Sequence, residues 1–170
     1  MIYVTKSPKE TQQLAGFLFT PRLTTDDKNN AKGNRLLSVG LENRKKSLVI
    51  ALEGELGAGK TVFAQGLAQA LGIKAKIKSP TFTLMKKYSI SSSRNFKFKI
   101  LNYKFLYHLD CYRLRDHKDL STLGIEDILA NTENIVLIEW SDRVKKILPK
   151  KHIKIHIDHI SKNERKITVS

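Results

Sequence analysis

The segment Gly54-Glu55-Leu56-Gly57-Ala58-Gly59-Lys60-Thr61 decides the fold of this chain. It fits the pattern G-x-x-x-x-G-K-[ST] at every fixed position. Glycines let the backbone curl so that successive N–H groups face a phosphate group, and the helix that follows adds the positive end of its dipole. The segment follows an apolar run and opens an amphipathic one, which is the context that the pattern requires. The sequence therefore predicts a phosphate-binding loop.

The side chains after the loop give this prediction its chemistry. The Lys60 ammonium is expected to reach the β- and γ-phosphates, and the Thr61 hydroxyl to ligate Mg²⁺. We expect nucleotide contacts from every residue of the loop and from the next position, Val62. The predicted cofactors are ATP and Mg²⁺, with ATP favoured over GTP because the chain holds no guanine-reading N-K-x-D motif. The alternative is an ordinary glycine turn with a surface lysine.

The hydrophobic pattern predicts an α/β protein around this loop. Ser7, Pro8 and Glu10 indicate a helix start, and Leu14, Phe17 and Leu18 are expected on one face of that helix. Further helices are predicted over 61–71 (with Gly72 as its C-terminal cap), over 116–130 (broken at Gly124) and over 141–148. Strands are predicted over 2–5, 47–52, 81–88, 96–109, 135–138, 151–157 and 167–169.

Interleaved helices and apolar strands favour a P-loop NTPase-like three-layer sandwich, whose mixed sheet includes an antiparallel hairpin. The length of 170 residues fits a single domain over 1–170. Residues 20–46 are predicted to form a polar loop within it. Residues 89–105 are predicted to form a basic hairpin.

Two carboxylates end apolar runs and are candidates for the metal site. Asp110 follows Tyr107-His108-Leu109, and Glu139 follows the run 135–138. A P-loop protein needs a carboxylate near the metal, and strand ends supply it. Spacing alone leaves open which acid holds Mg²⁺ and which orients the attacking water. The alternative for each is a solvated acid at the end of a strand.

Two further segments are candidates for the site. Thr81 lies in Ser79-Pro80-Thr81-Phe82-Thr83, after the helix that follows the phosphate-binding loop. Many nucleotide hydrolases place a segment that senses the γ-phosphate at this point of the chain. The alternative there is a turn that enters a strand. Trp140 follows Glu139 directly, so its indole is expected either to shield that carboxylate from water or to contact a partner. The alternative is a plain core tryptophan.

Composition excludes several classes of protein. The chain has one cysteine, Cys111, which excludes an intrachain disulfide and a multi-cysteine metal cage. Its apolar runs are far shorter than the roughly 20 residues that span a bilayer. With no signal-like N-terminus, a reducing cytoplasm is the expected location. The net charge of +15 is abnormal, and residues 82–107 carry six basic and no acidic side chains. Such a charge indicates either a nucleic-acid partner or compositional drift.

The motifs, in order, resemble those of the TsaE (YjeE) family of bacterial P-loop ATPases, which support synthesis of threonylcarbamoyladenosine (t6A) in tRNA. The resemblance covers roughly residues 1–157. Besides the phosphate-binding loop, it rests on the motifs S-P-T-F-T-L (79–84), H-L-D-C-Y-R-L (108–114), L-G-I-E-D-I-L (123–129) and I-E-W-S-D-R (138–143). Two departures from the family pattern are a polar segment over 22–46 that is longer than expected and a hairpin around 89–104 that is long and basic.

The resemblance implies a role for each matched residue. Lys60 would bind phosphate, and Thr61 and Asp110 would hold Mg²⁺. Thr81 would sense the phosphate, while Glu139 and Trp140 would form the pair needed for hydrolysis. The implied partners are the proteins TsaB and TsaD. TsaD transfers the threonylcarbamoyl group to adenosine 37 of tRNA, and ATP hydrolysis by the TsaE protein would reset the complex between turnovers. Contact with tRNA would be indirect or through the basic hairpin.

Two other functions stay open at this point. A small-molecule kinase is the first, although only Arg113, Arg115 and Arg143 are arginines near the predicted site and no arginine-rich lid follows. A basic nucleic-acid-binding module is the second. Its binding would weaken steeply with salt and would not depend on Lys60.

Overall fold

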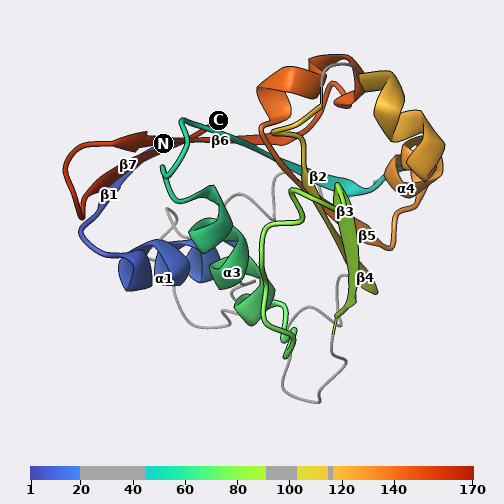
Figure 1. The fold of residues 1–170 in the computed structure, drawn as a ribbon. Coiled ribbons are helices and arrows are strands. Elements are labelled where there is room, and N and C mark those ends of the chain that lie inside the picture. The colour runs from blue at the N-terminus through green and yellow to red at the C-terminus, as the bar shows by residue number, and fades with distance from the viewer. Residues whose placement is uncertain (20–44, 91–102, 115–116) are drawn as a thin grey trace.

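One mixed sheet of seven strands organises the molecule, in the order β1-β7-β6-β2-β5-β4-β3 (Figure 1). The computed structural model describes residues 1–19, 45–90, 103–114 and 117–170. The strands are β1 (Ile2–Thr5), β2 (Leu48–Glu53), β3 (Met85–Ser89), β4 (Phe105–Asp110), β5 (Asn134–Glu139), β6 (Ile153–His159) and β7 (Arg165–Val169). The helices are α1 (Pro8–Phe19), α3 (Lys60–Ala70) and α4 (Ile125–Ala130), with 3₁₀ helices η2 (His117–Leu123) and η3 (Ser141–Ile147).

The centre of the sheet is parallel and its edges are antiparallel. Strand β2 pairs in parallel with β5 and β6, and β5 pairs in parallel with β4. The pairs β3–β4, β6–β7 and β1–β7 are antiparallel. The mixed sheet with an antiparallel portion is thus confirmed. The middle of the predicted basic hairpin and nearly all of the predicted polar loop lie outside the described residues.

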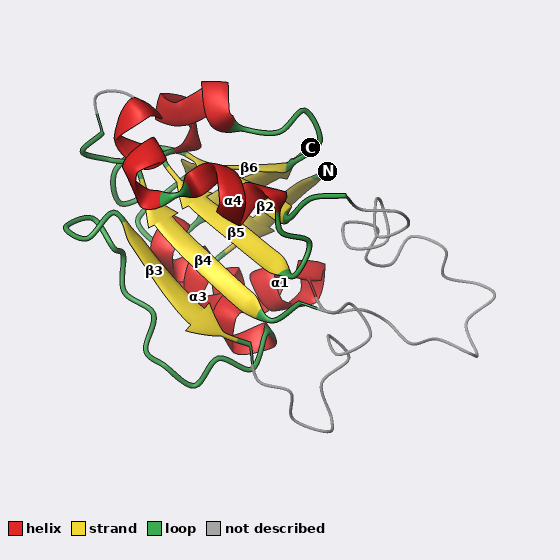
Figure 2. Ribbon diagram, turned by 90° about the vertical axis from the view of Figure 1, so that its right-hand side faces the viewer, coloured by secondary structure: helices red, strands yellow, loops and turns green. Residues whose placement is uncertain are grey.

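Helices cover both faces of the sheet, which gives the three layers that the sequence predicts (Figure 2). Helices α1 and α3 pack against one face over a core that includes Ile50, Phe63 and Leu106. Helix α4 and the two 3₁₀ helices cover the other face over a second core that includes Val136 and Ile138. Strand β5 alternates between these cores, as the period of two in a strand requires.

Helix α1 starts at the predicted cap. The backbone N–H of Glu10 donates to Ser7 Oγ at 3.2 Å, and Glu10 Oε2 accepts the Lys6 N–H at 2.8 Å. The predicted apolar face is wrong at Phe17, which is 44% exposed, whereas Leu18 is buried. The buried side of α1 instead continues to Phe19, whose ring meets Phe63 of α3 edge-on at 6.3 Å between centroids. The face of α1 that packs on the core is therefore shifted by one residue from the predicted face and includes Ala15, Leu18 and Phe19.

Helices α1 and α3 approach closely where both lack side chains. A Cβ atom at Gly66 of α3 would lie 2.2 Å from the carbonyl oxygen of Gln12 in α1, a distance that real Cβ atoms do not reach. At Gly16 of α1 the nearest atom to such a Cβ is Ala70 Cβ at 3.7 Å, an ordinary contact. Gly66 is thus the position that sets the spacing of the two helices.

The strand predicted over 81–88 begins later than expected. Residues Thr81 to Thr83 form a turn, in which the Thr83 N–H donates to the Pro80 carbonyl at 2.9 Å. Leu84 then takes a left-handed backbone with φ of 61°. Strand β3 therefore starts at Met85.

Two predicted helices also differ in detail from the structure. The helix predicted over 141–148 forms as a 3₁₀ helix with non-helical backbone at Val144. The prediction over 116–130 is confirmed from residue 117 on, because η2 and α4 meet at Gly124 with φ of 67°.

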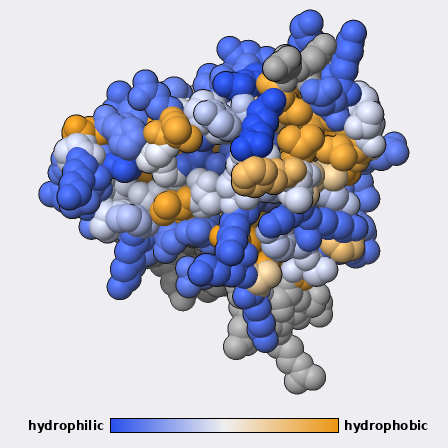
Figure 3. Space-filling view, viewed as in Figure 1, coloured by the Kyte–Doolittle hydropathy of each residue, from blue (hydrophilic) through white to orange (hydrophobic). Residues whose placement is uncertain are grey.

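The visible surface is largely hydrophilic, as the net charge of +15 predicts (Figure 3). Apolar residues also reach the surface near the phosphate-binding loop and the turn after it, where Leu56 is 71% and Phe82 is 82% exposed. In the part of the chain that the structure describes, no helix combines the length and the apolar character that a membrane crossing needs.

Candidate nucleotide-binding site

The predicted phosphate-binding loop connects β2 to α3 at the end of the parallel strands. Its three glycines have left-handed backbone, with φ of 136° at Gly54, 77° at Gly57 and 106° at Gly59. At Gly54, space also forbids a side chain, because a Cβ atom would lie 2.3 Å from the carbonyl oxygen of Ile157 in β6. The loop is held from its other side, where Arg165 Nε of β7 donates to the Ala58 carbonyl at 3.0 Å.

The start of α3 presents unused donors to the loop. Within the described residues, the N–H groups of Gly59, Lys60 and Thr61 donate to no hydrogen-bond acceptor, and the helix has no side-chain cap. The first N–H groups of a helix have no partner inside it and are suited to an anion. These donors, with the glycine backbone before them, fit the phosphates of a nucleotide.

Lys60 is folded against the loop that precedes it. Its Nζ atom donates to the carbonyls of Gly54 and Glu55, at 2.7 and 2.8 Å, and the residue is only 5% exposed. Burial lowers the pKa of Lys60 below its ordinary value, although the negative charges of Glu139 and Asp110 oppose that effect. The ammonium group is therefore a poorly hydrated cation that lies against the predicted phosphate-binding loop.

Glu139 at the end of β5 touches the first turn of α3. The Thr61 hydroxyl donates to both carboxylate oxygens of Glu139, at 3.0 Å each. On its other side, Oε1 of Glu139 contacts Nε2 of His108 at 2.8 Å. Glu139 and His108 are both buried, with 2% and 0% exposure. Of the two carboxylates that the sequence singles out, Glu139 is thus the one bonded to the hydroxyl that P-loop proteins use for Mg²⁺.

Asp110 at the end of β4 holds a different segment. Its Oδ2 atom accepts hydrogen bonds from the hydroxyls of Ser79 and Thr81, the latter at 2.6 Å. Its Oδ1 atom accepts the Tyr112 N–H at 2.9 Å, and its own N–H donates to the Leu84 carbonyl at 3.0 Å. Asp110 therefore binds both ends of residues 79–84, which we call the sensor segment.

The two carboxylates nevertheless belong to one site. Asp110 and Glu139 are opposite each other in the parallel register of β4 and β5. Both point to the face that α3 covers, because they continue the alternation of Leu106 and Leu137, which belong to the core beneath that helix. The structure therefore brings Lys60, Thr61, Thr81, Asp110 and Glu139 to one end of the sheet.

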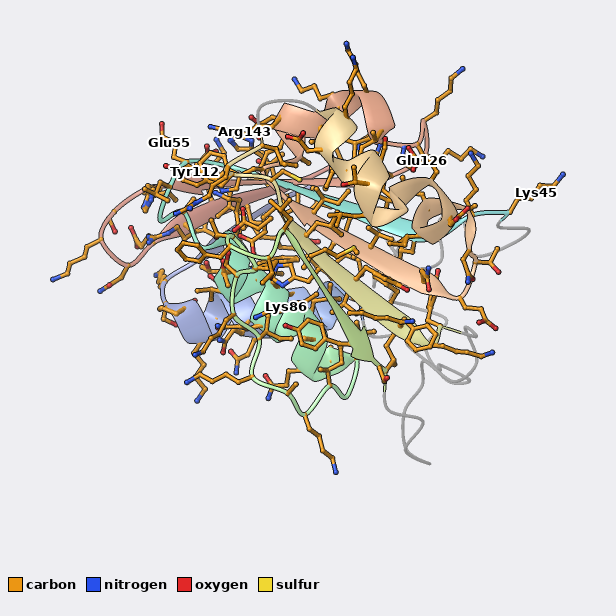
Figure 4. The ribbon with its side chains drawn as sticks, turned by 45° about the vertical axis from the view of Figure 1, so that its right-hand side comes forward. Lys45, Glu55, Lys86, Tyr112, Glu126 and Arg143 are labelled. Atoms are coloured by element: carbon orange, nitrogen blue, oxygen red, sulfur yellow. The ribbon has the colours of Figure 1, made fainter. Side chains whose placement is uncertain are left out.

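Aromatic and guanidinium groups cover this end. The Trp140 ring lies over Lys60, with Nζ 3.8 Å from the ring centroid, and packs against Tyr112 at 4.9 Å between centroids. Trp140 itself has a left-handed backbone, with φ of 60°. Arg143 donates to the Tyr112 carbonyl at 2.5 Å. Figure 4 shows Tyr112, Arg143 and Glu55 at the same end of the molecule.

The oxygen donors fit a hard divalent cation. A hydroxyl and a neighbouring carboxylate, with phosphates and water completing the shell, are the ligands that Mg²⁺ uses beside nucleotides. The described residues include no cluster of three or more histidine, cysteine and acidic side chains that could form an all-protein cage. The donor set therefore fits a cation that arrives with a nucleotide.

Sequence reasoning missed several residues of the site. It treated His108 as a strand residue and gave no role to Ser79 or Tyr112. Strand periodicity could have found His108, because the spacing H-x-D places it on the same face as Asp110. Cys111, next to Asp110, is also buried, and burial raises its pKa to about 12.

Comparisons with known proteins identify the family of this chain. The family model described as "Threonylcarbamoyl adenosine biosynthesis protein TsaE" matches residues 23–167. A protein of Haemophilus influenzae named tRNA threonylcarbamoyladenosine biosynthesis protein TsaE is 40% identical over 115 residues, which are 68% of this chain and 65% of that protein. The chain thus spans slightly less than two thirds of that relative's length.

A second relative and a solved structure support the same assignment of family and fold. A Bacillus subtilis protein of the same name is 37% identical over 120 residues, which are 71% of this chain and 67% of the relative. Among solved structures, the crystal structure of Bacillus subtilis YdiB superposes with a TM-score of 0.65 and 27% identity, covering 99% of this chain and 83% of that one. The predicted P-loop NTPase-like α/β fold is confirmed.

Proposed function

Because this chain belongs to the TsaE family of threonylcarbamoyl adenosine biosynthesis proteins, we propose that it is a Mg²⁺-dependent ATPase that supports formation of t6A at adenosine 37 of tRNA. The observation that carries the ATPase proposal is the contact between Thr61 and Glu139 beside the buried Lys60. A phosphate-binding helix start, a cation and a carboxylate converge there, as nucleotide hydrolysis requires.

The phosphates are bound by the loop backbone and Lys60. The N–H groups at the start of α3 donate to phosphate oxygens, and the Lys60 ammonium neutralises charge that grows on the β- and γ-phosphates. Hydrolysis forms a bond between a water oxygen and the γ-phosphorus and breaks the bond to the bridging oxygen, giving ADP and phosphate. Fixed donors in a buried site stabilise such charge better than water does, because they need no reorganisation.

The two carboxylates divide the remaining work. Thr61 and Glu139, already in contact, are the residues that would hold Mg²⁺ most directly, with Asp110 at the neighbouring strand end. The ion, when bound, neutralises charge on the phosphates. Asp110 holds Thr81, so that the sensor segment stands beside the γ-phosphate position. Trp140 covers Lys60 and keeps water away from the ammonium group.

We further propose that the chain works with TsaB and TsaD, and that its ATP hydrolysis resets their complex between turnovers. The support is family membership, together with the exposed apolar residues Leu56 and Phe82 on the loop and the sensor segment. A partner that covers these residues would sense the state of the nucleotide. Binding to such a partner would also complete a site whose isolated activity is expected to be low.

The experiment that tests this proposal measures Mg²⁺-dependent release of phosphate from ATP by the full chain, alone and with a TsaB–TsaD pair. We expect strong stimulation by the pair and t6A formation in unmodified tRNA only when all proteins are present. Equal activity with and without the pair would separate the ATPase from tRNA modification and would favour the kinase alternative.

Two variants assign the activity to this site. Lys60→Ala should abolish phosphate release, because it removes the cation aimed at transition-state charge. Glu139→Gln should lower the release by at least about 100-fold, because it removes the charge of the carboxylate that would hold Mg²⁺. Lys151→Ala, at an exposed residue far along the chain, is the matched control for the loss of a lysine. Phosphate release by a folded Lys60→Ala protein at the wild-type rate would refute the assignment.

The kinase alternative has less support from the described arginines. Arg143 is bonded to Tyr112 and lies over the rings of Tyr112 and Trp140. Arg113 lies over the exposed ring of Phe82, 4.3 Å from its centroid. Both guanidinium groups thus contact aromatic rings of this chain.

A further inference from the structure

His108 is a fully buried polar residue beside the proposed metal-binding carboxylate. It lies on β4, two residues before Asp110, and has 0% exposure. Its Nε2 atom contacts Oε1 of Glu139 at 2.8 Å. Its Nδ1 atom has no hydrogen-bond partner among the described residues. The contact with Glu139 is thus the one polar contact that the structure shows for this imidazole.

This arrangement is costly for a residue with no purpose beyond packing. An unpaired buried polar atom costs about 1–3 kcal/mol. The core around His108 is apolar, with Leu106 before it on the same face and Leu137 opposite it on β5. A leucine would satisfy such a position without the penalty. What the imidazole adds is a single rigid N–H donor directed at Glu139.

The donor fixes how the Glu139 carboxylate is oriented. Thr61 contacts both oxygens of that carboxylate, whereas His108 contacts only Oε1. The Thr61 hydroxyl has one proton to share between the two oxygens, so it favours neither of them, and the histidine is the side chain that distinguishes Oε1 from Oε2. Without it, the carboxylate could rotate about its last torsion at little cost.

We propose that His108 is a positioning residue for Glu139: its Nε2–H group anchors Oε1 and leaves Oε2 facing Thr61 and the nucleotide-bound cation. The role in hydrolysis rests on the proposed function, whereas the anchoring contact does not. Carboxylate and carbonyl partners that orient a metal ligand from behind are typically worth 10- to 100-fold in activity or metal affinity. In those sites a carboxylate orients a metal-binding histidine, whereas here the histidine orients the carboxylate.

The test compares two replacements of similar size. His108→Gln can place an amide N–H near the Nε2 position, whereas His108→Met fills the space without a donor. In Mg²⁺–ATP hydrolysis by the full chain with its partner pair, we expect His108→Met to lower kcat by 10- to 100-fold and to leave KM within about threefold. His108→Gln should recover most of the lost kcat. His152→Met, at a half-buried histidine after η3, is the matched control.

A second readout does not depend on hydrolysis. Long-range proton–nitrogen correlation spectra of the wild-type chain should show His108 protonated at Nε2, and its signals should shift in Glu139→Gln. Protonation at Nδ1 alone would overturn the anchoring contact. Wild-type kcat in a folded His108→Met protein, or an equal loss in the Gln and Met variants, would overturn the positioning role. Absence of hydrolysis in the wild type, with Nε2 protonated, would refute the proposed function and leave the contact standing.

Discussion

The ammonium nitrogen of Lys60 lies 3.8 Å from the centroid of the Trp140 ring. Trp140 comes directly after Glu139, so one dipeptide supplies both the carboxylate bonded to Thr61 and the ring that covers the lysine. A cation over a desolvated indole gains about 2 kcal/mol. The left-handed backbone at Trp140 costs about 1–3 kcal/mol. The ring is therefore held over Lys60 by local contacts that offset the strain of its own backbone.

Nucleotide binding is expected to change the fluorescence of Trp140. Because this is the single tryptophan of the chain, its emission reports on Lys60 without interference. A phosphate that binds Lys60 would attract the ammonium group away from the Trp140 ring. We therefore expect the tryptophan emission to change with added ATP or ADP until the site is saturated. The change should be lost in Lys60→Ala. An unchanged spectrum at a nucleotide concentration shown by calorimetry to saturate the site would contradict this expectation.

Asp110→Ala is expected to release the sensor segment. The substitution removes the acceptor for Ser79 and Thr81, and hydrogen bonds to a charged group are worth about 1.5–3 kcal/mol. Amide hydrogen exchange in peptides that cover residues 79–84 should accelerate by about tenfold or more, since about 1.4 kcal/mol corresponds to tenfold. Asp119→Ala on the exposed surface of η2 is the control and should leave these peptides unchanged. Equal exchange in wild type and Asp110→Ala would show that the hydroxyl contacts do not hold the segment.

Alkaline pH should destabilise the protein through Cys111. Its pKa is about 12 in the folded chain, because burial and the charge of Asp110 disfavour the thiolate, against an ordinary value of 9.0. The unfolded chain loses this proton first, so the stability that the raised pKa supports is complete below pH 9 and is lost as pH rises toward 12. At pH 10 the loss is about 1.4 kcal/mol relative to neutral pH.

Cys111→Ala removes this titration. Urea unfolding at pH 7 and pH 10 should therefore show a smaller fall in stability for the variant than for the wild type. The comparison cancels the other groups that titrate in this range. An identical fall in both proteins would mean that the thiol titrates alike in the folded and unfolded chains.

Gly66→Ala and Gly16→Ala are expected to have opposite effects on stability. The Gly66 Cβ would meet the backbone of Gln12 at 2.2 Å, so α1 and α3 must separate, and overpacking typically costs about 1–3 kcal/mol. The Gly16 Cβ makes only an ordinary contact, so the gain of about 0.5–1 kcal/mol from replacing a helical glycine should dominate. Thermal unfolding of the two variants measures both effects. A Gly66→Ala protein as stable as Gly16→Ala would show that the helix pair adapts freely.

Local patterns predicted the elements well wherever one residue type forces one conformation. The glycines of the loop, the Ser7 cap and the break at Gly124 each leave the backbone little choice. The pattern failed where tertiary contacts decide. Phe17 is exposed because α1 buries Ala15, Leu18 and Phe19 instead, and Phe19 contacts Phe63 of α3. Strand β3 is shortened because Asp110 pulls the sensor segment into a turn, a contact between residues about 30 apart in sequence.

The site followed the same division. Strand ends predicted the two carboxylates, and the motif predicted Lys60 and Thr61. Spacing could not tell Asp110 from Glu139, because both end parallel strands at the same edge. Their difference lies in strand order: β5 is next to the strand that enters the loop and β4 is one place further away. That order is set by the whole sheet, which no short motif encodes.

The close approach of Gly54 to Ile157 and the bond from Arg165 to Ala58 extend the nucleotide site to the last hairpin of the chain. None of the recognisable motifs lies beyond residue 143. Nevertheless, β6 packs directly against the first glycine of the loop, and β7 supplies the arginine that donates a hydrogen bond to the loop. A chain cut after residue 150 would keep every side chain proposed for the site and would lose the two strands that contact the loop. Substitutions in this hairpin can therefore weaken nucleotide binding without touching the nucleotide.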